Sequence, residues 1–352
     1  MIHFVMAWAQ PEFTREEINK AGERLIGNSD MDEDHALTVV NNWRAIHAYP
    51  LQAVKMTLSG RAKRQDTVAL IAQRTKRIPA IIVKLNGHRA AGLGLKLSQM
   101  HDIGGCRAVL SNVTRVETLV RAYEEASAKN PLRGGIFHRK YDYITEPKPD
   151  GYRSVHLVYK YCSSAKKLAI YNNLKIEIQI RSELQHAWAT AVETIDFFTG
   201  QALKSNIGKA SWKRFFALVS NEFARLEKRP LVPETPTDAN ESRNELRNYT
   251  EQLKLLDGLT TATRTLVGKA GQFFLLELDL TTRTLRTTSF KKEKAGEAQE
   301  KYLEAEKLNI GKTDKQTVLV SVDSLAALPK AYPNYYLNIR AFVSILSRIL
   351  AK

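Results

Sequence analysis

Apolar and polar positions alternate strictly along residues 176–181, where every second residue is isoleucine. A period of two places successive side chains on opposite faces of a β-strand. One face of this predicted strand is therefore apolar, and the other carries Glu177, Gln179 and Arg181. A carboxylate, an amide and a guanidinium on one face form a polar wall that a purely structural strand seldom needs. The pattern therefore indicates a functional face.

The same periodicities predict an α/β unit over the first two thirds of the chain. A turn rich in Pro and Gly at residues 147–151 leads directly into a second alternating strand. The expected strands cover residues 103–110, 154–161, 168–171 and 174–181. The expected helices cover residues 11–26, 34–49, 50–58, 67–84, 114–128, 182–197 and 212–228. Strands that alternate with helices predict a sheet flanked by helices.

A proline-rich segment at residues 230–237 indicates an exposed connector. Beyond it the pattern predicts a long polar helix, a hairpin, a charged helix, a strand and a terminal helix. In that order they cover residues 241–269, 273–290 (turning at 281–283), 293–308, 317–322 and 335–350. We therefore expect an N-terminal unit at residues 1–229, a linker and connecting helix at 230–270, and a smaller C-terminal α/β unit at 271–352.

Charge adds a prediction about partners. The 352 residues include 53 Lys and Arg against 37 Asp and Glu, a formal net charge of +16. Eight basic residues fall within 29 positions: Arg61, Lys63, Arg64, Arg74, Lys76, Arg77, Lys84 and Arg89. Such a concentration attracts polyanions and predicts contact with nucleic acid. The alternative is that a Lys-rich surface only aids solubility.

Other compositional features favour a cytoplasmic protein. No apolar run approaches the roughly 20 residues of a membrane-spanning helix, and no segment has the length of a signal peptide. Cys106 and Cys162 are the only cysteines, which is too few for a zinc cage and is typical of buried thiols in a cytosolic protein.

Two carboxylates suggest the chemistry. Asp102 opens the strand predicted at 103–110, and Glu177 lies on the strand predicted at 174–181. Carboxylates on neighbouring strands can hold Mg²⁺ and accept a proton from a hydroxyl, as phosphoryl-type transfer requires. The alternatives are that Asp102 caps its strand and that Glu177 pairs with Arg181 along the same face.

Four ordered blocks carry a family resemblance. They are residues 74–78 (RTKRI) followed by Lys84, 101–107 (HDIGGCR), 147–156 (PKPDGYRSVH) and 177–181 (EIQIR). Together they resemble the synthetase domain of the RelA/SpoT alarmone synthetases over about residues 70–195. The resemblance implies a mixed β-sheet of nucleotidyltransferase type flanked by helices. It also implies transfer of pyrophosphate from ATP to a ribose 3′-hydroxyl, with release of AMP and with Mg²⁺ as cofactor.

The resemblance also implies roles for individual residues. Asp102 would bind Mg²⁺, and Glu177 would assist the metal or act as general base. The implied ATP-binding residues are two arginines that sandwich the adenine and two lysines that hold the phosphates: Arg74, Arg107, Lys76 and Lys84. Tyr152 would stack on the acceptor base. The other implied acceptor-side residues are Lys148, Arg153, His156 and Gln179. Taken alone, each of these could equally be a solvated charge or a lid on the core.

The family divides by acceptor, and a second resemblance bears on that division. Residues 42–51 (NWRAIHAYPL) and 332–337 (YPNYYL) resemble CapRel, the fused toxin–antitoxin proteins of phage defence. This implies a toxin that modifies the 3′-terminal adenosine of tRNA and inhibits translation. It also implies a C-terminal antitoxin unit, zinc-finger-like without zinc, in which Tyr332 and Tyr335 block the ATP site until a phage capsid protein binds. The alternative for both tyrosines is ordinary aromatic packing.

The acceptor and even the activity have rival predictions. Small alarmone synthetases carry a glutamate on the helix after the last block, and registration on Trp188 puts Val192 there, with Glu193 one position later. Either the acceptor is not a guanine nucleotide or the helix is shifted by one residue. The rival enzyme is a (p)ppGpp or (p)ppApp synthetase. The rival from another class is an inactive nucleotide sensor or tRNA-binding module.

Overall fold

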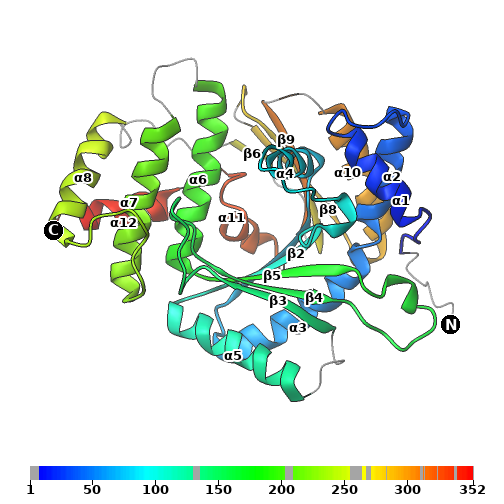
Figure 1. Ribbon diagram of the computed structural model, residues 1–352, viewed down its shortest axis with the longest axis horizontal. Coiled ribbons are helices and arrows are strands. Elements are labelled where there is room, and N and C mark those ends of the chain that lie inside the picture. The colour runs from blue at the N-terminus through cyan, green and yellow to red at the C-terminus, as the bar shows by residue number, and fades with distance from the viewer. Residues whose placement is uncertain are drawn as a thin grey trace.

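A computed structural model describes most of the chain. The described residues are 8–129, 135–202, 209–253, 264–266, 271–282, 284–309, 312, 314–322, 324–336 and 339–351. Within them, one mixed sheet runs through the molecule, with helices on both faces (Figure 1). This agrees with the α/β class expected from the alternating periodicities.

The sheet has nine strands in the order β3-β4-β5-β2-β1-β9-β7-β8-β6. The strands are β1 (Leu70–Thr75), β2 (Gly104–Leu110), β3 (Ile136–Asp142), β4 (Val155–Lys160), β5 (Lys175–Ser182), β6 (Arg264–Leu266), β7 (Phe273–Asp279), β8 (Thr284–Phe290) and β9 (Lys315–Val322). The pairs β2–β5 and β6–β8 are parallel, and the other neighbours are antiparallel. Parallel and antiparallel pairs together make the sheet mixed, as the resemblance implied.

One strand pair joins the N-terminal and C-terminal units. Strand β1 pairs with β2 on one side and with β9 on the other, where Ala72 lies opposite Val322 and Arg74 opposite Val320. The small side chain of Ala72 packs in the same apolar cluster as Phe274 of β7. The units expected at residues 1–229 and 271–352 therefore share one continuous sheet.

Helices divide the apolar interior into separate layers. The described helices of eight or more residues are α1 (Arg15–Arg24), α2 (Glu33–Ala45), α3 (Ala48–Gln65), α4 (Ile78–Ala90), α5 (Val113–Lys129), α6 (Glu183–Ala202), α7 (Lys209–Glu227), α8 (Ala239–Gln252), α10 (Ala295–Leu308) and α12 (Arg340–Leu350). Helices α3 and α5 cover one face of β2, β4 and β5, while α6 and the short helix α11 (Leu328–Ala331) lie over the other (Figure 1). A second layer packs α12 against α6, α7 and α8 through Phe342 and Leu346.

Several sequence predictions were wrong. Residues 67–84 do not form one helix, because β1 occupies 70–75 and α4 begins at Ile78, with a proline in its first turn. The strand predicted at 168–171 is a 3₁₀ turn (Ala169–Tyr171, η2) that buries Tyr171. Strand β3 was not predicted, since it is an edge strand with mostly exposed side chains.

The C-terminal predictions were wrong in detail. The terminal helix starts at Arg340 and not at residue 335. The helix predicted at 241–269 is confirmed as α8 only to Gln252, and residues 264–266 form strand β6. Residues 254–263 and 267–269 of that helix, Arg283 of the predicted hairpin and Leu337 of the 332–337 block lie outside the described residues. Within the described chain, none of the helices combines the length and the apolarity needed to cross a bilayer.

Candidate active site

A cavity of about 240 Å³, here called the central cavity, lies on the polar face of β1, β2 and β5 and is bounded by α6. It is lined by most of the predicted site residues and by two further charged ones: Arg74, Lys76, Asp102, Arg107, Tyr152, Glu177, Gln179, Tyr332, Arg181 and Glu193. The alternation along β5 explains this arrangement. Ile176 and Ile178 pack into the core with α3 and α5, so Glu177 and its polar neighbours face the cavity.

Asp102 lies between two lysines at the cavity wall. Its carboxylate oxygens accept hydrogen bonds from Lys76 Nζ and Lys84 Nζ, each at 2.9 Å. Lys76 follows β1 directly and Lys84 is on α4. Burial alone would raise the pKa of Asp102, but the two ammonium groups lower it to about 2. The carboxylate is therefore ionised at neutral pH, as a metal ligand must be.

Glu177 is the end of a hydrogen-bonded chain of side chains. Its Oε1 lies 3.0 Å from His156 Nδ1, and its Oε2 accepts from Gln179 Nε2 at 2.7 Å. The other ring nitrogen of His156 lies 2.7 Å from the Tyr152 hydroxyl. Burial raises the pKa of Glu177, but the contact with His156 outweighs it and the pKa is lowered. Arg181 contacts His186 at 2.8 Å and is not paired with Glu177.

Three guanidinium groups surround the same space. Arg74, Arg107 and Arg181 line the central cavity. Burial and the neighbouring Arg107 lower the pKa of Arg181 to about 9, and burial also lowers that of Arg107. Within the described residues, the Nε atoms of Arg107 and Arg181 are buried without a hydrogen-bond partner. Buried cations with unused donors are unfavourable unless a ligand supplies acceptors, and a polyphosphate would do so.

The end of α11 covers one of these arginines. The Arg107 guanidinium lies 5.4 Å from the centre of the Tyr332 ring and donates to the Ala331 carbonyl. The Tyr332 hydroxyl donates to the Gln73 carbonyl at 2.9 Å. The face on which an adenine is predicted to stack therefore already carries a tyrosine.

A second chain of hydrogen bonds reaches α11 through a histidine. Arg181 can only donate, so His186 Nδ1 is the acceptor and its Nε2–H donates to the Lys330 carbonyl at 2.9 Å. Burial and the charge of Arg181 hold the pKa of His186 well below its usual value, which fits this neutral tautomer. The polar face of β5 is thus linked to the backbone of the C-terminal unit.

Five predicted residues do not line the central cavity, and two of them, Lys84 and His156, contact the residues Asp102 and Glu177 that do. Arg153 is buried and pairs with Glu227 of α7 at 2.8 Å. The Lys148 ammonium lies over the Tyr143 ring, 4.3 Å from its centre, and 5.4 Å from that of Tyr152. Tyr335 is fully buried in the apolar cluster of β7 and β9.

Two charged cavity residues were not predicted as site residues. Arg181 was noted as part of the polar face, and the same period of two that identified Glu177 would have included it. Glu193, one position after Val192, is the α6 carboxylate that lines the cavity. Val192 instead packs against the apolar layer of α6, α7 and α12. A shift of one residue along α6 therefore places Glu193 where a glutamate was expected.

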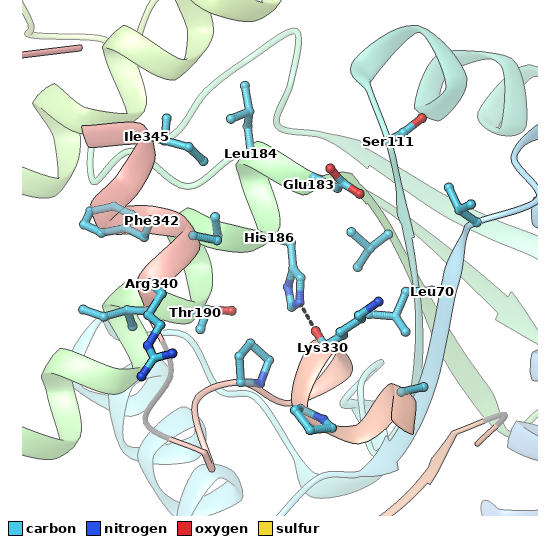
Figure 2. Close-up of a pocket in the computed structure, with 18 of the residues that line it drawn as sticks. Leu70, Ser111, Glu183, Leu184, His186, Thr190, Lys330, Arg340, Phe342 and Ile345 are labelled. Atoms are coloured by element: carbon cyan, nitrogen blue, oxygen red, sulfur yellow. Dashed lines mark hydrogen bonds between the residues drawn. The ribbon is translucent and has the colours of Figure 1, made fainter. Parts of the chain in front are cut away.

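A larger cavity of about 990 Å³ lies between α6, α12 and the α11 segment and contains none of the predicted site residues. Figure 2 shows its apolar wall, including Leu184, Phe342 and Ile345, together with the hydrogen bond from His186 to Lys330. Lys330 lines this cavity and Tyr332 lines the central one, so the end of α11 borders both spaces.

The carboxylates fit a magnesium site. Asp102 and Glu177 both line the central cavity, and the charge of Asp102 acts to raise the pKa of Glu177. Mg²⁺ is commonly bound by one or two carboxylates together with substrate phosphates and water. Among the described residues, no group of three or more His, Cys, Asp and Glu side chains is arranged to hold a metal. Two carboxylates beside a basic cavity thus match a metal that arrives with a polyphosphate.

The chain is similar in sequence to known proteins. Residues 73–196 match the family model described as a region found in RelA/SpoT proteins. GTP pyrophosphokinase YwaC of Bacillus subtilis is 35% identical over 91 residues, which are 26% of this chain and 40% of that relative. The matched stretch thus spans less than half of the relative's length.

The chain is also similar to solved structures. Small alarmone synthetase 1 from Bacillus subtilis, bound to its product pppGpp, is 22% identical, with a TM-score of 0.41 over 56% of this chain and 94% of that one. A GTP pyrophosphokinase family protein from Streptococcus pneumoniae is 24% identical, with a TM-score of 0.39 over 51% and 86%. Residues 73–196, which supply the central cavity with all of its named residues except Tyr332, are similar to the region found in RelA/SpoT proteins.

Proposed function

We propose that this chain is an ATP-dependent pyrophosphokinase that transfers the β,γ-pyrophosphate of ATP to a ribose 3′-hydroxyl and releases AMP. The observation that carries the proposal is the composition of one cavity. It joins two carboxylates, Asp102 and Glu177, with basic groups that include Lys76 and Arg181. A transferred pyrophosphate needs charge neutralisation and alignment more than covalent chemistry, and these groups supply both.

The site residues have separate roles in this proposal. Mg²⁺ held by Asp102, assisted by Glu177, would neutralise charge on the triphosphate. Lys76 and Lys84, which now contact Asp102, would turn to phosphate oxygens when the nucleotide enters. Glu177, if it is not engaged by the metal, would accept the hydroxyl proton as the acceptor oxygen bonds to the β-phosphorus and the bond to AMP breaks. His156 and Gln179 hold its two oxygens for that step.

The proposed acceptor is the 3′-terminal adenosine of tRNA, and its modification would inhibit translation. The net charge of +16 supports a polyanionic acceptor, because phosphate contacts supply affinity without reading sequence. Tyr152 lines the cavity and would stack on the terminal base. Its position follows the turn at Gly151, whose φ of 93° favours glycine.

A second candidate acceptor is a guanine or adenine nucleotide, which would make the chain a (p)ppGpp or (p)ppApp synthetase. The specific observation in its favour is that Glu193 lines the central cavity. A carboxylate there can accept hydrogen bonds from the N–H groups of a guanine base. The relatives named above are a GTP pyrophosphokinase and a synthetase bound to pppGpp.

We further propose that the C-terminal unit inhibits the site and that a partner releases it. The Tyr332 ring occupies the Arg107 face, and the remaining cavity of about 240 Å³ is smaller than the roughly 300–1,000 Å³ of typical ligand pockets. The CapRel resemblance suggests a phage capsid protein as the partner. Such a partner would activate the chain only by binding the open state more tightly than the closed one.

The test uses the full chain, unaltered and as Tyr332→Ala, incubated with γ-labelled ATP and either tRNA or GDP. Label on tRNA 3′ ends supports the toxin proposal, and a labelled guanosine product supports the second candidate. Asp102→Asn is the control that should abolish either product. A further arm offers ADP as the adenine nucleotide acceptor. If none of the three acceptors is labelled although ATP binds, the chain is a nucleotide or tRNA sensor and the enzymatic proposal fails.

A further inference from the structure

A buried polar cluster joins the C-terminal unit to the N-terminal unit away from the central cavity. It consists of Arg44 on α2 with Tyr302 and Glu306 on α10, which are 0%, 0% and 5% exposed. Arg44 donates to Glu306 Oε2 at 2.7 Å and to the Tyr302 hydroxyl at 2.5 Å. The Tyr302 hydroxyl in turn donates to Glu306 Oε1 at 3.1 Å. Burial alone would lower the pKa of Arg44, but Tyr302 and Glu306 raise it, so the guanidinium remains charged.

This cluster holds the loop between β1 and α4 from both sides. Arg44 Nε donates to the Lys76 carbonyl at 2.9 Å, and the Ile78 N–H donates to Glu306 Oε1 at 3.0 Å. Ile78 is the first residue of α4, and Arg77 at its N-cap supplies no side-chain cap. Glu306 therefore satisfies one of the backbone N–H groups that a helix start leaves open. Its negative charge also lies at the end of the helix where it is favoured.

The loop and helix held in this way carry both lysines that contact Asp102. Lys76 belongs to the loop, and Lys84 lies about two turns along α4. The same loop is tied to the C-terminal unit once more, because Arg77 donates to Gln316 of β9. A shift of the start of α4 would therefore displace both phosphate-binding candidates at once.

Stability alone does not account for such a cluster. A buried ion pair is often no more stabilising than apolar side chains of similar volume, because both charges lose their hydration. The cluster also fixes the position of the loop, because its hydrogen bonds to the Lys76 carbonyl and from the Ile78 N–H have defined directions. The geometry points to Glu306 and Arg44 as positioning residues for Lys76 and Lys84. The C-terminal unit would then complete the site that Tyr332 covers. This inference rests on the proposed pyrophosphokinase function.

The decisive variant replaces both charges with apolar side chains, Arg44→Met together with Glu306→Leu, in the full-length Tyr332→Ala chain. It leaves no unpaired buried charge, but the Ile78 N–H and the Tyr302 hydroxyl lose their acceptor, so the chain should stay folded with a moderately lower melting temperature. The loop would lose its hydrogen bonds to Arg44 and Glu306. The dissociation constant for Mg²⁺·ATP and the KM for ATP should therefore each rise about tenfold or more. Glu306→Gln, which keeps the shape, should show a smaller rise in the same direction.

The matched control joins the same two helices. Lys307 of α10 pairs with Asp34 of α2 at 3.0 Å, but both side chains are largely exposed. Lys307→Ala should leave melting temperature, ATP affinity and turnover unchanged. The inference is overturned if the double variant is folded and binds ATP within about twofold of the parent. If the double variant does not fold, unchanged ATP affinity in Glu306→Gln overturns it instead.

ATP binding and pyrophosphate transfer, measured separately, distinguish the positioning role from the proposed function. Calorimetric titration measures ATP binding whether or not pyrophosphate is transferred. If the parent binds ATP and transfers nothing, the proposed function fails while the loss of affinity in the double variant still reports on positioning. If the parent transfers pyrophosphate and the variants match it, the positioning role fails while the function stands.

Discussion

Two of the regions in which the C-terminal unit meets the N-terminal unit differ in construction. At the end of α11, one aromatic ring and three hydrogen bonds hold the contact, and cavities of about 240 and 990 Å³ lie on either side. At α10 and β9, a strand pair, an apolar cluster and the buried Arg44–Glu306 pair hold it. Cavities border the first region, whereas strand pairing and buried side chains hold the second, so we infer that the site can open locally while the rest stays joined.

The largest expected effect comes from breaking both regions together by deleting residues 271–352. This removes the strand paired with β1, the partner of Arg44 and the α12 side chains that pack on Phe215 and Phe223. An unpaired buried charge alone costs about 3–5 kcal/mol, a large fraction of a typical stability. We expect little folded, active protein, measured by soluble yield and circular dichroism. A stable and strongly toxic fragment would show that the second region is as dispensable as the first.

The next largest effect is expected from removing the charge of Asp102, with no further change to either contact region. In the open Tyr332→Ala chain, Asp102→Asn should lower turnover by roughly 10²- to 10³-fold, because the metal loses a charged ligand. Asp102 and its partners Lys76 and Lys84 are mostly buried, so the variant should stay folded but lose on the order of 2 kcal/mol of unfolding free energy. Steady-state transfer and thermal melting measure the two quantities. Retained turnover would remove Asp102 from the site.

A smaller effect is expected from opening the first region alone. Tyr332→Ala removes the ring from Arg107 and should tighten ATP binding about tenfold, since the closed state is no longer favoured. Tyr332→Phe keeps the ring and loses the bond to the Gln73 carbonyl, so it should remain closed at a cost of about 1 kcal/mol. Titration with ATP and thermal melting test both variants. Equal affinity in all three chains would mean that Tyr332 packs but does not inhibit.

The prediction of these two regions from sequence succeeded unevenly. The polar face of β5 could be predicted because the alternation of apolar and polar residues shows which side chains face away from the core. Strand β1 could not, because Ile71, Ala72 and Gln73 are all buried and no alternation remains. Its pairing with β9 joins residues about 250 positions apart, and no local pattern encodes that. Nor could spacing separate Tyr332, which lines the cavity, from Tyr335, which fills the core.

The smallest expected effect is a pH dependence at the central cavity. The folded pKa of Asp102, about 2, lies below its ordinary value of 3.8, so the ionised form is favoured in the folded state. Its contribution to the free energy of unfolding, on the order of 2 kcal/mol, is therefore present above about pH 4 and lost as pH falls towards 2. Urea unfolding at pH 5 and pH 3 should show a smaller loss for Asp102→Asn than for the unaltered chain. Equal losses would mean that the lysine contacts do not stabilise the fold.

The identity of the nucleotide left after turnover tests the central claim most directly. A pyrophosphokinase converts ATP to AMP, whereas an ordinary kinase or phosphatase leaves ADP. Chromatography of the full-length Tyr332→Ala reaction with tRNA or GDP should show AMP formed in equal amount with the modified acceptor, and none with Asp102→Asn added. Formation of ADP, or an unchanged nucleotide in a chain that binds ATP, would contradict the proposed reaction.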